Sequence, residues 1–215
     1  MHIPDGFLDA KTWISTAALS AGAIGYSIKK SREELNERQV PKLGIMAAFI
    51  FAAQMVNFPV AGGTSGHLLG AALATILLGP WNACIIISTV LVIQCLGFQD
   101  GGITALGGNI FNMALLGVTA AFLVFKVFSG ILKSPAGRNI SMFLAAWASV
   151  FAASAMAAVE LSISGTVPFS IAFPAMAGWH AVIGAGEGII TVVAVNYVNK
   201  LGFADEKSNI SSGVK

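Results

Sequence analysis

The sequence is poor in charged residues. Of its 215 residues only 10% are Asp, Glu, Lys or Arg, while 56% are hydrophobic, and the mean hydropathy is +0.80. A soluble domain keeps a charged surface, and this composition cannot supply one. It therefore excludes an ordinary soluble protein and predicts an all-α integral membrane protein with lipid as its solvent. No polar stretch is long enough to fold separately, so a single transmembrane domain over residues 1–215 is expected.

A strong net charge and a disulfide framework are also lacking. The net charge of +2 is too small to indicate nucleic acid binding. Cys84 and Cys95 lie eleven residues apart in one apolar stretch, roughly 16 Å along a helix, which exceeds the reach of a disulfide. The first residues carry no positive charge, and no cleavage site follows them, so no signal peptide is expected. The chain is predicted to start at Met1 with an outward-facing segment, residues 1–9.

Two enzyme motifs are missing. No Gly-x-x-x-x-Gly-Lys loop is present, so ATP hydrolysis is not expected of this chain. No His-Glu-x-x-His helix occurs either, which disfavours an intramembrane metalloenzyme. A standalone secondary metal-ion permease would need a path lined by titratable groups, for which Glu160 and Glu187 are the only intramembrane carboxylates. The permease and the metalloenzyme remain the alternatives. Both Glu160 and Glu187 could instead serve only to form structural hydrogen bonds within the bundle.

Seven apolar stretches can be separated at Gly, Pro and charged residues, and most approach the roughly 20 residues that cross a bilayer as helix. The third is short and ends at Gly79-Pro80, which predicts a hairpin with the fourth. The predicted bundle of about seven transmembrane helices comprises residues 10–28, 42–57, 67–79, 81–98, 108–128, 141–162 and 175–198.

The basic residues predict the orientation, because short cytoplasmic loops retain Lys and Arg. Eleven of the twelve fall in three regions that an odd number of spans places on one side, and only Lys11 lies opposite. The N-terminus is therefore predicted outside and the C-terminus in the cytoplasm. The eleven are Lys29, Lys30, Arg32, Arg38, Lys42, Lys126, Lys133, Arg138, Lys200, Lys207 and Lys215.

Histidines are few, and the predicted topology places His2, His67 and His180 all on the outer side, at the ends of predicted elements. A histidine at position two can chelate a metal with the free α-amine of Met1, its own amide nitrogen and its Nδ1. These three nitrogens lie in a plane and leave one position for another imidazole. Square-planar nitrogen ligation suits Ni²⁺ or Cu²⁺. His67, which follows a Gly-rich loop, is the best candidate for the fourth ligand.

Other polar residues could orient these ligands. The candidates for this outer shell are Asp5, Ser65, Asn109 and His180, and Asp100 belongs to the same class. Asp5 and Asp100 also fit ordinary Asp-Gly turns, and Asn109 also fits a helix cap. His180 and Glu187 lie two turns apart, about 10 Å, and so cannot bind one metal together.

Several segments spread over essentially the whole chain match the signatures of one known family: 1–8 (MHIPDGFL), 51–59 (FAAQMVNFP), 62–70 (GGTSGHLLG), 78–81 (LGPW), 100–107 (DGGITALG), Asn109 and 184–188 (GAGEG). The chain resembles the CbiM/NikM family, the substrate-binding (S) membrane components of nickel and cobalt energy-coupling factor (ECF) transporters. The resemblance implies metal ligation by Met1, His2 and His67, import of Ni²⁺ or Co²⁺, and a place in a prokaryotic cytoplasmic membrane. It also implies a transmembrane coupling (T) protein, two cytoplasmic ATPases and a small accessory membrane subunit as partners. Of the two metals, planar ligation by an amide nitrogen favours Ni²⁺ over Co²⁺.

Overall fold

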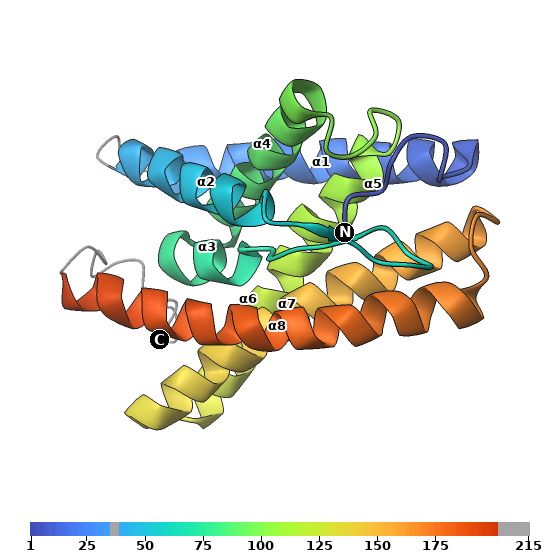
Figure 1. Ribbon diagram of the computed structural model, residues 1–215. Helices are drawn as coiled ribbons and strands as arrows, with labels where there is room; N and C mark the ends of the chain where they lie inside the picture. Colours follow the sequence, from blue (N-terminus) through green and yellow to red (C-terminus); the bar gives the residue numbers. More distant parts are fainter. Residues whose placement is uncertain (35–38, 202–215) are drawn as a thin grey trace.

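The computed structural model describes residues 1–34 and 39–201 (Figure 1). Arg38, Lys207 and Lys215 lie outside these ranges. Within them the chain forms the predicted all-α bundle of seven helices, one of which continues without a break through α5, a π-helical segment η2 and α6. The bounds are α1 Ala10–Glu34, α2 Val40–Gln54, α3 Ala71–Leu78, α4 Pro80–Phe98, α5 Leu106–Ile110, η2 Phe111–Leu116, α6 Gly117–Ile131, α7 Pro135–Ile163 and α8 Phe169–Lys200.

Not all seven helices are alike as membrane spans. Four of the described helices are long and apolar enough to cross a bilayer: α4, the continuous helix Leu106–Ile131, α7 and α8. α2 is apolar but shorter, and α3 has eight residues. α1 has 25 residues but a polar inner face, on which the Ser20 hydroxyl donates to the carbonyl of Gly107 (2.8 Å). The chain is thus a multi-pass membrane protein whose helices differ in length and polarity.

The segment before α3 is the main departure from the predicted helices. A helix was predicted over residues 67–79, but α3 begins at Ala71, after Gly70 with a left-handed φ of 78°. The preceding chain forms a two-residue antiparallel ladder between β1 (Phe58–Pro59) and β2 (Ser65–Gly66). Leu68 and Leu69 were included in the predicted helix because they are apolar. Over so few residues, an apolar run that is buried by tertiary contacts cannot be distinguished from the start of a helix.

Two helices start earlier than predicted because proline was read as a break. α7 begins at Pro135 rather than at residue 141, with Ser134 accepting the N–H of Gly137 as an N-cap (3.0 Å). α8 begins at Phe169 rather than at residue 175 and contains Pro174, which lies exposed near its start. Gly79, with φ of 84°, turns the chain directly from α3 into α4, as the predicted hairpin requires.

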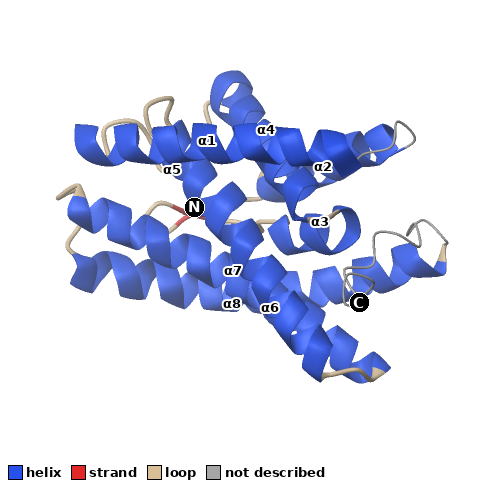
Figure 2. Ribbon diagram, turned by 180° about the vertical axis from the view of Figure 1, so that it is seen from behind, coloured by secondary structure: helices blue, strands red, loops and turns tan. Residues whose placement is uncertain are grey.

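The helices form two layers with the N-terminus between them (Figures 1 and 2). α1 packs on α4 and α5, and α7 packs along α8. Small residues allow the second contact: a Cβ on Gly188 would lie 2.5 Å from the ring of Phe143, and one on Gly184 3.2 Å from Trp147. The N-terminus lies in the middle of the molecule in both views, so the first residues form part of its core.

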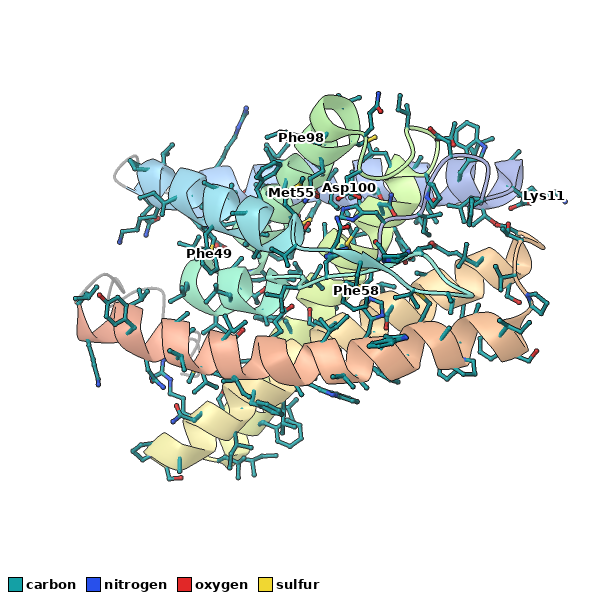
Figure 3. The ribbon with its side chains drawn as sticks, in the orientation of Figure 1. Lys11, Phe49, Met55, Phe58, Phe98 and Asp100 are labelled. Atoms are coloured by element: carbon teal, nitrogen blue, oxygen red, sulfur yellow. The ribbon has the colours of Figure 1, made fainter. Side chains whose placement is uncertain are left out.

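The basic ends of the helices lie together. The end of α1, the end of α8 and the α6–α7 connection lie at one end of the molecule, whereas Lys11 lies at the other (Figure 3). Both cysteines are free and buried, as their spacing predicts.

Candidate metal site

The N-terminal segment is threaded into the protein and held there by main-chain hydrogen bonds. Met1 and Ile3 are fully buried, and His2 is 4% exposed. The Asn109 amide accepts from the N–H of Ile3 (2.8 Å) and donates to its carbonyl (3.1 Å), as a neighbouring strand would. The N–H of Gly102 also donates to the carbonyl of Ile3 (2.9 Å). Position 102 must be glycine, because a Cβ would lie 2.2 Å from the nitrogen of Asp5.

Ser65 gathers two of the nitrogens that the sequence predicts as ligands. The α-amine of Met1 donates to the carbonyl and to the hydroxyl of Ser65, the latter at 2.8 Å. The backbone N–H of His2 donates to the same hydroxyl (3.1 Å). The β2 strand therefore brings the amine and the amide to one point, directly before His67.

The imidazoles of His2 and His67 lie face to face, with ring centroids 4.5 Å apart and an interplanar angle of 27°. Nε2 of His2 pairs with the amide oxygen of Gln94 (3.0 Å), an acceptor, so the ring proton sits on Nε2 and Nδ1 keeps its lone pair. In His67 the proton sits on Nδ1, which donates to the carbonyl of Leu68 (2.7 Å). Nδ1 of His2 and Nε2 of His67 are both buried without a hydrogen-bond partner.

His180 approaches the same region from α8. Its Nδ1 donates to the carbonyl of Met176 (2.7 Å), and its buried Nε2 has no hydrogen-bond partner. It lies close enough to interact electrostatically with His67 and with the α-amine. A third imidazole lone pair thus lies near the first two.

Burial sets the protonation of these groups. It lowers the pKa of the Met1 amine well below its ordinary 8.0, opposed by the charge of Asp100. Burial, followed by repulsion from the amine, lowers the pKa of His2 to about 3 and that of His67 well below 6.5. The neutral forms carry the lone pairs that bind metals. The surroundings therefore favour the ligating form of each group.

Three comparisons place the chain among known proteins. A family model described as the cobalt uptake substrate-specific transmembrane region (CbiM) matches residues 2–203. The chain belongs to the CbiM family. A relative from Archaeoglobus fulgidus is 42% identical over 200 residues, covering 92% of this chain and 65% of that protein. The fused nickel transport protein NikMN of Rhodobacter capsulatus is 38% identical over 215 residues, covering 93% and 62% respectively.

A solved structure agrees over nearly the whole length. The crystal structure of a truncated transition metal transporter superposes with a TM-score of 0.88 at 32% identity, covering 93% of this chain and 99% of that one. The chain spans less than two thirds of the length of the two curated relatives above, 65% and 62% respectively. The fold is therefore shared over 93% of this chain.

In this CbiM family member the structure brings most of the predicted site residues together. Met1, His2, Ser65, His67 and His180 meet around one point. Among the described residues no group of three or more His, Cys, Asp or Glu side chains could hold a metal. The nitrogens that meet here instead include the α-amine of Met1 and the backbone nitrogen of His2, which share the Ser65 hydroxyl.

Asp5, Asp100 and Asn109 make different contacts in the structure. Asp5 lies at the surface, where it accepts from the N–H and the hydroxyl of Thr104 (2.7 and 2.6 Å) and pins the N-terminal segment. Asp100, labelled in Figure 3, is more than a turn residue. Its carboxylate lies 3.4 Å from Nδ1 of His2 and accepts from the side-chain amide of Asn57 (3.0 Å). Asn109 does not cap its helix, because its side chain is bonded to Ile3.

Gln94 was missed by the sequence reasoning. It is fully buried in the apolar helix α4, and its bond to His2 fixes which ring nitrogen carries the proton. A polar amide inside a membrane span is a functional signal in its own right. That signal was present in the sequence and could have identified Gln94.

Proposed function

We propose that the chain is the substrate-capture subunit of an ATP-driven ECF transporter that imports a divalent transition metal, with Ni²⁺ preferred over Co²⁺. The observation that carries the proposal is the convergence of four nitrogens on one buried point. They are the Met1 amine, the His2 amide and Nδ1, and Nε2 of His67. Met1 and His2 together form one five-membered and one six-membered chelate ring, and His67 completes the plane.

The preference for nickel follows from this donor set. Three nitrogens of one chelate are coplanar, and an ionised amide is a strong in-plane donor. Square-planar nitrogen ligation is typical of Ni²⁺ and Cu²⁺, whereas Co²⁺ more readily takes other geometries. The ring nitrogens that face away from the metal donate to Gln94 and Leu68, and such bonds fix the orientation of metal-binding imidazoles.

Metal analysis tests the proposal directly. Protein purified in detergent without chelator, from cells supplied with nickel and cobalt, is expected to carry one Ni²⁺ or Co²⁺ per chain, with nickel in excess. Absence of both metals from folded protein would contradict the proposal. Copper in their place would keep the planar site but change its substrate.

We expect transport itself to require a larger assembly that contains this chain. We expect a transmembrane coupling protein, two cytoplasmic ATPases and a small accessory membrane subunit in a prokaryotic cytoplasmic membrane, since this sequence has no phosphate-binding loop of its own. Uptake by the assembly should require ATP. Uptake by this chain alone that follows the proton gradient and ignores ATP would support the standalone secondary permease instead.

The proposed orientation places the N-terminus outside and the C-terminus in the cytoplasm, on the positive-inside argument. A cysteine replacing exposed Lys29 should be protected from a membrane-impermeant maleimide in intact cells and become reactive after permeabilisation. A cysteine replacing exposed Lys11, at the opposite end, is the matched control and should react in intact cells. The reverse pattern would invert the topology. Ser31 is unsuitable for this test, because it is buried and its hydroxyl donates to Asn82 (2.7 Å).

A further inference from the structure

Glu187 is a buried carboxylate in α8 that the proposed function leaves unused. It is 2% exposed, and both of its oxygens accept from backbone N–H groups outside its own helix. Oε2 accepts from the N–H of Leu69 (2.5 Å), and Oε1 accepts from the N–H of Gly70 (2.9 Å). Both oxygens act as acceptors, as those of a carboxylate do, and hydrogen bonds to a carboxylate are short and strong. Two successive amides of the segment before α3 are therefore fixed to α8.

The same segment is held from the other side by α2. The side-chain amide of Gln54 donates to the carbonyl of Leu69 (2.7 Å). Gly70 packs on Ile50 so closely that a Cβ would lie 2.8 Å from its Cγ1, and its φ of 78° disfavours any side chain. Non-helical backbone inside a membrane protein needs such partners, because lipid offers none. Gln54 and Glu187 supply them for both polar groups of Leu69.

One peptide unit joins Glu187 to His67. The carbonyl of Leu68 accepts the Nδ1 proton of His67 (2.7 Å), and the N–H of the same peptide bond, on Leu69, donates to Glu187. The peptide unit is planar and stiff, so its position fixes the direction of the imidazole. Hydrogen bonds in such a chain also polarise one another. Electron density is thereby pushed toward Nε2 of His67, which is buried and unpartnered.

We propose that Glu187 is a positioning residue of the metal site, which orients and polarises His67 through the peptide unit between Leu68 and Leu69. The inference rests on the proposed function, since His67 is the ligand on which Glu187 acts. It corresponds to the outer-shell carboxylates of metal-bound histidines, with a peptide unit inserted between carboxylate and ring. It also ties the ligand to α8, a helix of 32 residues that runs the length of the molecule.

The test compares two buried carboxylates of the full chain in detergent. Glu187→Gln removes the charge and presents an amide N–H to one backbone N–H, so Ni²⁺ affinity measured by calorimetry should fall by about 10-fold to 100-fold. Glu160→Gln is the matched control. Glu160 is equally buried in α7, but its side chain accepts a hydrogen bond from the Asn112 amide (2.6 Å) rather than from the His67 segment. Its affinity should stay within about threefold of the parent protein.

A double-mutant cycle separates positioning from general destabilisation. In a His67→Ala background the N-terminal chelate still binds Ni²⁺ weakly, and Glu187→Gln should then cause no further loss. The d–d absorption of bound Ni²⁺ should also shift in Glu187→Gln and remain unchanged in Glu160→Gln. Glu187→Asp keeps the charge on a shorter arm and should recover part of the affinity; it replaces Glu187→Gln in the cycle if that variant does not fold.

The outcomes distinguish this inference from the proposed function. A parent protein that binds neither Ni²⁺ nor Co²⁺ refutes the function itself. A parent that binds Ni²⁺ while Glu187→Gln binds equally well overturns the role of Glu187. Equal losses in Glu187→Gln and Glu160→Gln, or losses that add in the His67→Ala background, overturn it as well.

Discussion

Acetylation of the N-terminus is expected to abolish high-affinity Ni²⁺ binding while leaving every side chain unchanged. The α-amine of Met1 is a proposed ligand, and an acetylated nitrogen has no basic lone pair to offer. The effect should be large because the amine anchors the chelate that holds the His2 amide and Nδ1 in one plane. Calorimetry on native, acetylated and N-terminally tagged protein measures it, with the intact mass establishing that the native chain starts at unformylated Met1.

The structure adds a steric contribution to the same experiment. Met1 is fully buried against Ser65, so extra atoms have no room and the segment must partly withdraw. The melting temperature of each metal-free protein should therefore be measured as well, to show whether the N-terminal segment is still bound in the core. Inserting one Ala between Met1 and His2 would instead create a longer chelate that fills all four planar positions without His67. If native, acetylated and tagged proteins bind Ni²⁺ alike, the N-terminal chelate is wrong.

The second large effect is expected for His67→Ala. This substitution removes the proposed fourth ligand and leaves the N-terminal chelate in place, so Ni²⁺ affinity should fall by more than about 100-fold, the upper end of the cost of losing an outer-shell partner. The bundle should remain folded, because His67 lies in an irregular segment whose backbone is held by Gln54 and Glu187 rather than by its ring. Titration calorimetry with a melting curve for each protein checks both statements.

His180→Ala is the comparison that makes this result specific. Its ring also keeps a buried, unpartnered Nε2 near the site, but it is expected to act on the surroundings of the metal rather than in the plane. Its loss should therefore be clearly smaller than that of His67→Ala. Unchanged stoichiometry and affinity in His67→Ala would remove His67 from the ligand set, and a full loss in His180→Ala alone would transfer the role to His180.

Two kinds of site residue differ in how readily the sequence reveals them. His2 and His67 could be predicted as ligands because the chelating chemistry of a histidine at position two and a Gly-rich approach are local properties. Other residues bond to partners that lie 92 to 118 positions away in the sequence, namely Gln94, Asn109 and Glu187. Their polar character inside apolar helices marks them as exceptional, but the partner of each depends on how the helices pack. The sequence left Asn109 open between orienting the histidines and capping a helix, and only the structure shows that its side chain is bonded to Ile3.

The sequence by itself determined the solvent, the helical class and most of the helix centres, because scarcity of charge and long apolar runs are sufficient physical causes for helices in lipid. It also determined which atoms could chelate a metal, since ring size is fixed by covalent structure. Only the tertiary structure decided that residues 67–70 are not helical, that Pro174 lies within a helix, and that the N-terminus enters the core. Each of these depends on hydrogen bonds between distant segments, such as Met1 to Ser65 and Leu69 to Glu187. In a membrane interior such bonds override local preference, because an unpaired backbone group there has no water to bind.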